Sequence, residues 1–155
     1  MYGPEDIIPV NRSHLERQDP HPLMAAYYDY RYGRAFSRDD VREAVIPAYM
    51  GLITQIDDQI GRLISYLKES GQINDTMIVF TSDHGDYLGD HWMGEKELFH
   101  DASARIPLII VDPSEEADAT RGSVNKSLTE AIDLLPTFLE FAGGEVPDHI
   151  LEGHS

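Results

Sequence analysis

Apolar residues follow a helical spacing over a long stretch of the chain that begins at Ser37. They recur every three or four positions, at Val45, Ala48, Leu52, Ile56, Ile60, Leu63 and Leu67, which predicts an amphipathic helix. Ser37 is suited to cap its first turn, and we expect the helix to end near Gly71. Pro47 lies inside this stretch, so it is expected to kink the helix or to mark its true start.

Two short apolar runs follow the helix, and both have the composition of buried strands. The first covers residues 76–81 and comes after an Asn-Asp turn, and the second covers residues 106–111 and is closed by Asp112-Pro113. A final helix is predicted over residues 133–142, ending at a pair of glycines. The order of helix, strand, long loop, strand and helix indicates the α/β class.

The segment that precedes the long helix has no sustained period. Residues 1–37 contain four prolines and many aromatic and polar residues, with one short helix expected over 21–30. We interpret residues 1–37 as an irregular wrapping segment and residues 38–155 as the α/β portion. At 155 residues the chain has the length of one domain.

The charge balance narrows the classes of partner. Acidic residues outnumber basic residues 28 to 12, which gives a formal net charge of −16, so the field of the chain opposes binding to nucleic acid and to anionic membranes. No apolar run is long enough to span a bilayer. The first residues lack the pattern of a secretory signal, from which we expect a cytoplasmic protein. There are no cysteines, so thiolate ligands and a cysteine nucleophile are excluded within the chain.

The loop between the predicted strands is dense in side chains that carry chemistry. Asp83 and His84 directly follow the first strand, at the end where α/β sheets form their sites. A carboxylate and an imidazole suit a divalent ion such as Mn²⁺, Zn²⁺ or Ca²⁺. Lys96 could neutralise an oxygen of a phosphoryl or sulfuryl group as negative charge develops.

Each of these residues also has an ordinary structural interpretation. An Asp-His pair after a strand is more often a turn with a hydrogen-bonded histidine than a metal site. Lys96 lies between Glu95 and Glu97, as a solvated lysine on a charged surface would. The residues one by one therefore leave both interpretations open.

Several linked motifs, taken together, resemble the sulfatase family of the alkaline phosphatase superfamily. They are Ala48 to Ile53, Ile56 to Leu63, the run Thr-Ser-Asp-His-Gly-Asp-Tyr-Leu-Gly-Asp-His over 81–91, Lys96, the run Arg-Ile-Pro-Leu-Ile-Ile over 105–110, and Asp133 to Thr137. The resemblance covers roughly residues 40 to 142 and favours the phosphonate monoester hydrolase and arylsulfatase branches. It implies part of an alkaline-phosphatase-like sandwich, with a mixed sheet flanked by helices.

The resemblance also implies roles for individual residues. Asp83 and His84 match the second pair of metal ligands, and Lys96 matches the catalytic lysine that contacts the substrate. His91 and His100 are candidates for side chains that support the ligands from outside. Many arylsulfatases have asparagine at the position of His84, whereas phosphonate monoester hydrolases and several sulfatases have histidine there. The metal implied is Mn²⁺ or Ca²⁺, with Zn²⁺ or Mg²⁺ as alternatives.

One part of the family's catalytic machinery has no match in this chain. The family uses an upstream pair of aspartates and a formylglycine nucleophile, made from the first residue of a Cys/Ser-x-Pro-x-Arg motif. The sequence contains neither a cysteine nor a serine followed by x-Pro-x-Arg. No nucleophile is therefore assigned to any residue here.

The leading hypothesis is a carboxy-terminal part of a hydrolase of sulfate, phosphate or phosphonate esters that is inactive alone. Its substrate in the complete enzyme would be a small anionic ester. A domain that binds a cation or a partner without catalysis is the first alternative, and part of a metal-dependent phosphomutase or phosphotransferase is the second. Because half of a shared sheet would leave apolar surface exposed, self-association into a homo-oligomer is also expected.

Overall fold

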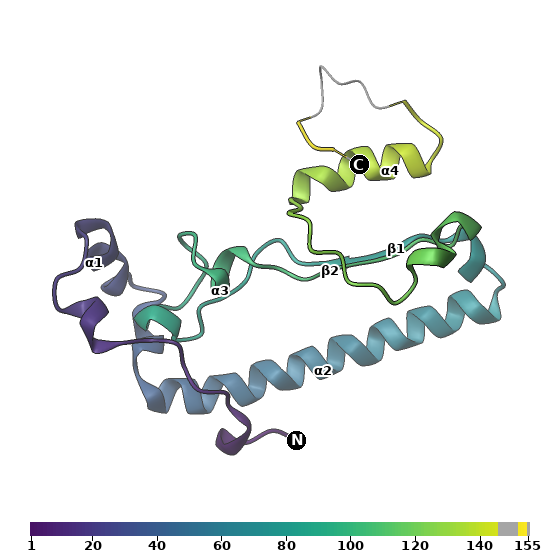
Figure 1. Cartoon of the computed structure of the whole chain (residues 1–155). Helices are drawn as coiled ribbons and strands as arrows, with labels where there is room; N and C mark the ends of the chain where they lie inside the picture. The colour runs from purple at the N-terminus through teal and green to yellow at the C-terminus, as the bar shows by residue number, and fades with distance from the viewer. Residues whose placement is uncertain (146–151, 155) are drawn as a thin grey trace. The chain divides into compact units, whose positions relative to one another are not determined.

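The computed structural model describes residues 1–145 and 152–154, and the chain forms two compact units, Met1–Glu115 and Glu116–Ser155. The helices and strands of the first unit are α1 (Pro22–Tyr28), α2 (Asp39–Glu69), β1 (Ile78–Thr81), α3 (Asp101–Ala104) and β2 (Leu108–Val111). The second unit contains α4 (Leu134–Phe141). Figure 1 shows α2 as the longest element, with β1 and β2 side by side. Among the described residues, no helix is both long and apolar enough to cross a membrane.

The predicted order of helix, strand, long loop, strand and helix is confirmed, with bounds that differ by one or two residues. Helix α2 begins at Asp39 and continues through Pro47, so the proline does not mark its start. Asp39 and Asp40 place negative charge in the first turn, where the helix dipole favours it. The final helix begins at Leu134.

The sheet of the described residues is smaller than the sequence predicted. Strands β1 and β2 pair antiparallel, with Ile78 opposite Val111 and Thr81 opposite Leu108. The predicted mixed sheet is thus represented by one antiparallel pair, since residues 1–145 and 152–154 supply two strands only. A pair of four-residue strands is marginal by itself and needs cover from other elements.

The core of the first unit lies beside the long loop rather than under the sheet. Tyr28, Tyr87 and Met93 form its buried cluster, and partly buried apolar residues from α1, the loop and α3 pack against it. In contrast, Leu108 to Val111 of β2 stay 36% to 56% exposed, and Leu52 of α2 is 56% exposed. The apolar face that the sequence predicted is therefore largely uncovered in this chain.

Arg42 ties α2 to the long loop. Its side chain is buried, its Nε donates to the carbonyl of Leu88 at 3.0 Å, and its Nη1 lies 3.3 Å from Asp39. A Cβ on Gly89 would come within 2.4 Å of this side chain, so glycine is needed where the loop crosses it.

Replacing Arg42 with leucine is expected to lower the free energy of unfolding by about 2 kcal/mol, because the carbonyl of Leu88 loses its buried donor. Urea unfolding of the chain measures this change. Arg62→Leu, at an exposed position of the same helix, is the matched control and should stay within about 0.5 kcal/mol of the parent. Equal effects of the two substitutions would contradict the role given to Arg42.

Candidate metal and anion site

The loop from Ser82 to His100 has an unusual backbone. Among residues 1–145 and 152–154, five non-glycine residues have positive φ angles, and all five lie in this loop: Leu88, His91, Trp92, Glu95 and Leu98. Such conformations cost free energy and persist where surrounding contacts hold them, which is common at functional sites. The backbone bonds that hold the loop include those from Tyr87 N to the carbonyl of Glu95 at 2.9 Å and from Gly89 N to the carbonyl of Met93 at 2.8 Å.

Asp83 and His84 follow β1 directly, as predicted, and their donor atoms face one another. The Oδ2 atom of Asp83 lies 3.4 Å from Nε2 of His84. The other carboxylate oxygen, Oδ1, accepts the backbone N–H of His84 at 3.0 Å. Two donor atoms that bind one ion at about 2.1 Å lie roughly 3.0 to 3.4 Å apart, so the pair fits a shared cation.

The tautomer of His84 is set by its other ring nitrogen. Nδ1 lies 2.7 Å from the carbonyl oxygen of Gly85, which can only accept a hydrogen bond. Nδ1 therefore carries the proton, and Nε2 keeps the lone pair. Backbone carbonyls support metal-binding histidines in this way in many proteins.

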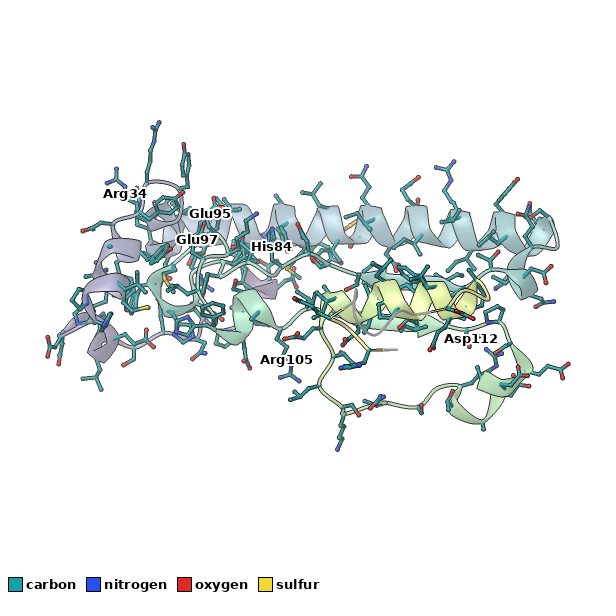
Figure 2. All side chains as sticks on the ribbon, turned by 90° about the horizontal axis from the view of Figure 1, so that it is seen from above. Arg34, His84, Glu95, Glu97, Arg105 and Asp112 are labelled. Carbon is teal, nitrogen blue, oxygen red and sulfur yellow. The ribbon has the colours of Figure 1, made fainter. Side chains whose placement is uncertain are left out.

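Lys96 reaches the same point from the far side of the loop. Its Nζ lies 2.8 Å from Nε2 of His84, where the ammonium group donates to the lone pair. The structure thus brings Lys96 to the adjacent pair Asp83 and His84, although Lys96 lies 12 positions after His84 in the sequence. Figure 2 shows His84 near Glu95 and Glu97, the acidic neighbours of Lys96, while Asp112 lies at the other end of the hairpin.

The electrostatics of the site keep Asp83 ionised. Desolvation by itself would raise the pKa of Asp83, but the neighbouring His84, two backbone N–H groups and Lys96 lower it below its ordinary value. The side chains of Asp83 and His84 are 84% and 37% exposed. The site is therefore open to solvent, with an anionic ligand ready for a cation.

The donor set is suited to a divalent ion but is incomplete. Among residues 1–145 and 152–154, no group of three or more His, Cys, Asp or Glu side chains is arranged to hold a metal. One carboxylate and one imidazole nitrogen are ligands that Mn²⁺ and Zn²⁺ accept. Further ligands would have to come from elsewhere, as the resemblance to sulfatases implied.

His91 and His100, the predicted supporting residues, lie together in a different group of side chains. Their rings stack with centroids 4.2 Å apart. Nδ1 of His100 is 2.9 Å from the hydroxyl of Tyr87, and Nδ1 of His91 is 3.2 Å from Oε1 of Glu16. Their role toward the metal ligands stays a prediction.

Two further residues position the site, and of these Ser103 was not predicted from the sequence. Ser103 is buried, and its Oγ donates to the carbonyl of Lys96 while its own carbonyl accepts Gly85 N–H at 2.7 Å. Gly85 must be glycine because a Cβ there would lie 2.0 Å from the carbonyl oxygen of Ala102. A serine in a short helix carries no spacing signal, but the glycine directly after Asp-His was a visible indication of close backbone approach.

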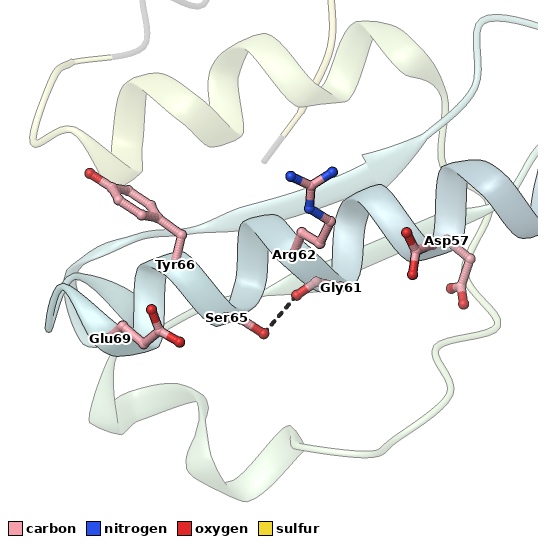
Figure 3. Close-up of a pocket in the computed structure, with 7 residues that line it drawn as sticks. Asp57, Gly61, Arg62, Ser65, Tyr66 and Glu69 are labelled. Carbon is pink, nitrogen blue, oxygen red and sulfur yellow. Dashed lines mark hydrogen bonds between the residues drawn. The ribbon is translucent and has the colours of Figure 1, made fainter.

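A separate hollow of about 570 Å³ lies on α2 and is less suited to an anionic ester. Figure 3 shows the residues that line it, all from one helix. Asp57, Asp58 and Glu69 give it three carboxylates against the single cation of Arg62. Such a charge balance repels sulfate and phosphate esters.

Comparison with known protein families identifies the family of this chain. The model of the family described as Sulfatase matches residues 14–144, which is most of the chain. The chain belongs to the sulfatase family. The part of the alkaline-phosphatase-like fold predicted from the sequence is supported by structural matches as well.

The relatives combine sequence and structural similarity with partial coverage. The multifunctional alkaline phosphatase superfamily protein PehA of Trinickia caryophylli is 40% identical over 95% of this chain and 30% of its own length. The phosphonate monoester hydrolase of Agrobacterium radiobacter superimposes with a TM-score of 0.85 at 33% identity, over 98% of this chain and 32% of its own. A protein solved with its substrate D-glucosamine-2-N,6-O-disulfate matches with a TM-score of 0.60 at 36% identity, over 76% of this chain and 23% of its own.

These two relatives match nearly all of this chain, but the chain spans only about a third of their own length. Membership of the sulfatase family implies a metal ion in the full enzyme. The 3.4 Å between Oδ2 of Asp83 and Nε2 of His84 is a separation that such an ion could bridge.

Proposed function

We propose that this chain supplies one side of the active site of a metal-dependent hydrolase of sulfate, phosphate or phosphonate esters. The observation that carries the proposal is the meeting of Asp83, His84 and Lys96 at one point, with separations of 3.4 Å and 2.8 Å around Nε2 of His84. Two metal ligands and a mobile cation are what an anionic ester needs at its reacting centre.

Each residue has its own task in this proposal. Asp83 and His84 hold the divalent ion, which acts as a Lewis acid when it is bound. Lys96 lies on the same side and neutralises a non-bridging oxygen of the ester as charge develops. Ser103 and Gly85 keep the two halves of the loop in register, so that Lys96 stays within reach of His84.

The chain by itself is proposed to bind a cation weakly and to be inactive. Its two ligands leave most of the coordination sphere to water, and its sequence contains no Cys/Ser-x-Pro-x-Arg motif from which the family makes its nucleophile. The substrate class of the whole enzyme is supported by relatives that include phosphonate monoester hydrolases and a protein bound to a sulfated sugar.

A substrate panel tests this proposal directly. The chain is incubated with nitrophenyl sulfate, phosphate, phosphonate and phosphodiester, each with and without Mn²⁺, and cation binding is followed separately by calorimetry with Mn²⁺. We expect no hydrolysis, and Mn²⁺ binding that Asp83→Asn removes. Hydrolysis that depends on Asp83 would show a complete site and overturn the proposal of an inactive part. Mn²⁺ binding that survives the substitution would remove Asp83 from the metal site.

A further inference from the structure

The segment from Asn11 to Arg17, here called the strap, is fastened to the turn Asp90–Trp92 by contacts between residues far apart in sequence. Asn11 N donates to Oδ1 of Asp90 at 2.9 Å, and the carbonyl of Asn11 accepts His91 N–H at 2.8 Å. The indole Nε1 of Trp92 donates to the carbonyl of Ser13 at 2.8 Å. These bonds hold the turn that precedes Lys96.

Trp92 is held between side chains of the strap. The guanidinium of Arg12 lies 4.2 Å from the centre of the indole ring, and that of Arg17 lies 5.4 Å away. The ring of His14 is tilted against the indole at 5.0 Å. Because two cations and an imidazole cover the only tryptophan of the chain, the indole reports directly on whether the strap is in place.

A row of titratable groups that the proposed reaction does not use connects Glu16 of the strap with the loop. Glu16 binds His91 through Oε1, the ring of His91 stacks on that of His100, and His100 binds the hydroxyl of Tyr87. The second oxygen of Glu16, Oε2, is buried without a hydrogen-bond partner. A buried carboxylate with one free oxygen leaves the strap sensitive to the charge of the rings beside it.

We propose that this row makes the strap a pH-sensitive clamp on the loop that carries Lys96, closed while His100 is neutral and released when His100 gains a proton. A protonated His100 has N–H groups on both ring nitrogens, so Nδ1 can only donate to the Tyr87 hydroxyl. It also places a positive charge against His91 at a ring separation of 4.2 Å. This charge opposes the stacking of the two rings, and the contact of His91 with Glu16 is weakened with it.

The charged groups around His100 give the direction of the effect. Burial and the neighbouring His91 lower the pKa of His100 below its ordinary value of 6.5, while Glu16 opposes them. Glu97 acts on Tyr87, whose pKa is raised mainly by burial. Because the folded pKa of His100 is depressed, the closed clamp has its full stability above pH 6.5 and loses it as pH falls through that lower pKa.

Trp92 fluorescence tests the clamp without any assay of hydrolysis. The titration is made in the His14→Gln background, from about pH 8 to about pH 5, because the imidazole of His14 contacts the indole directly. We expect Trp92 emission to move to longer wavelength in the acidic half of this range. His100→Asn should abolish that transition. Glu16→Gln should move it to higher pH, because the negative charge of Glu16 that favours protonated His100 in the closed state is gone.

His21→Asn is the matched control, since His21 caps α1 and has no contact with Trp92 that the structure describes. Circular dichroism checks that each variant is folded, and NMR titration of the histidine rings gives the pKa of His100 independently. An emission change that persists in His100→Asn would overturn the clamp. So would a transition in the parent that does not follow the titration of His100. Either failure would leave the proposed metal site untouched, because the readout does not involve Asp83 or His84.

Discussion

Replacing Asp83 with asparagine should reduce kcat/KM roughly a thousandfold in any polypeptide that joins this segment to a nucleophile-bearing part of the sulfatase fold, a loss of about 4 kcal/mol of transition-state stabilisation. The amide keeps the shape of the side chain but removes the negative charge that we propose holds a cation beside Nε2 of His84. The phosphonate monoester hydrolase of Agrobacterium radiobacter offers a host for the measurement, because it superimposes on 98% of this chain. Residues 1–155 would replace the matching segment of that enzyme.

Asp75→Asn is the matched control for this experiment. Asp75 is an exposed aspartate in the turn just before β1, so its substitution removes the same charge at the opposite end of the strand. We expect the control to retain the activity of the unsubstituted hybrid. Equal turnover with and without Asp83 would contradict the assignment of the ligand, whatever the origin of the remaining activity.

The second large effect is expected at Gly85, where alanine should lower the free energy of unfolding by roughly 3 kcal/mol. A Cβ at this position would lie 2.0 Å from the carbonyl oxygen of Ala102, which is backbone and cannot turn aside. The loop must then move away from α3, and the bond from Gly85 N to the carbonyl of Ser103 at 2.7 Å is lost. Equilibrium unfolding in urea measures the change.

Gly51→Ala provides the comparison within the same chain. Gly51 lies inside α2, and a Cβ there would meet nothing within 4 Å. Alanine has the higher helix propensity, so this substitution should stabilise the chain by up to about 1 kcal/mol. If the two glycines gave the same change, the close approach at Gly85 would not be what constrains it.

The Gly85 variant also separates stability from the geometry of the site. The carbonyl of Gly85 sets the tautomer of His84, so a shifted backbone should weaken cation binding even where the variant stays folded. Lys96 is affected as well, because Ser103 binds both the carbonyl of Lys96 and the N–H of Gly85. Calorimetry with Mn²⁺ on the folded variant would measure this second effect.

Local sequence signals were sufficient for the helices and strands. The period of apolar residues predicted α2 to within two residues of its start at Asp39, because helical spacing is a short-range property. The apolar runs predicted both strands, and the Asp-His pair was recognised at the end of β1. The antiparallel pairing was not predicted, since pairing direction depends on which strands the chain supplies.

The sequence by itself determined the order of elements and the sulfatase family, and it singled out Asp83, His84 and Lys96 as the candidate site residues. Only the tertiary structure decided that Lys96 turns back to within 2.8 Å of His84. It also decided that the strap covers Trp92, through bonds between residues 79 positions apart. Helical and strand periods record interactions between near neighbours, whereas the contacts that shape this site join distant segments and leave no period in the sequence.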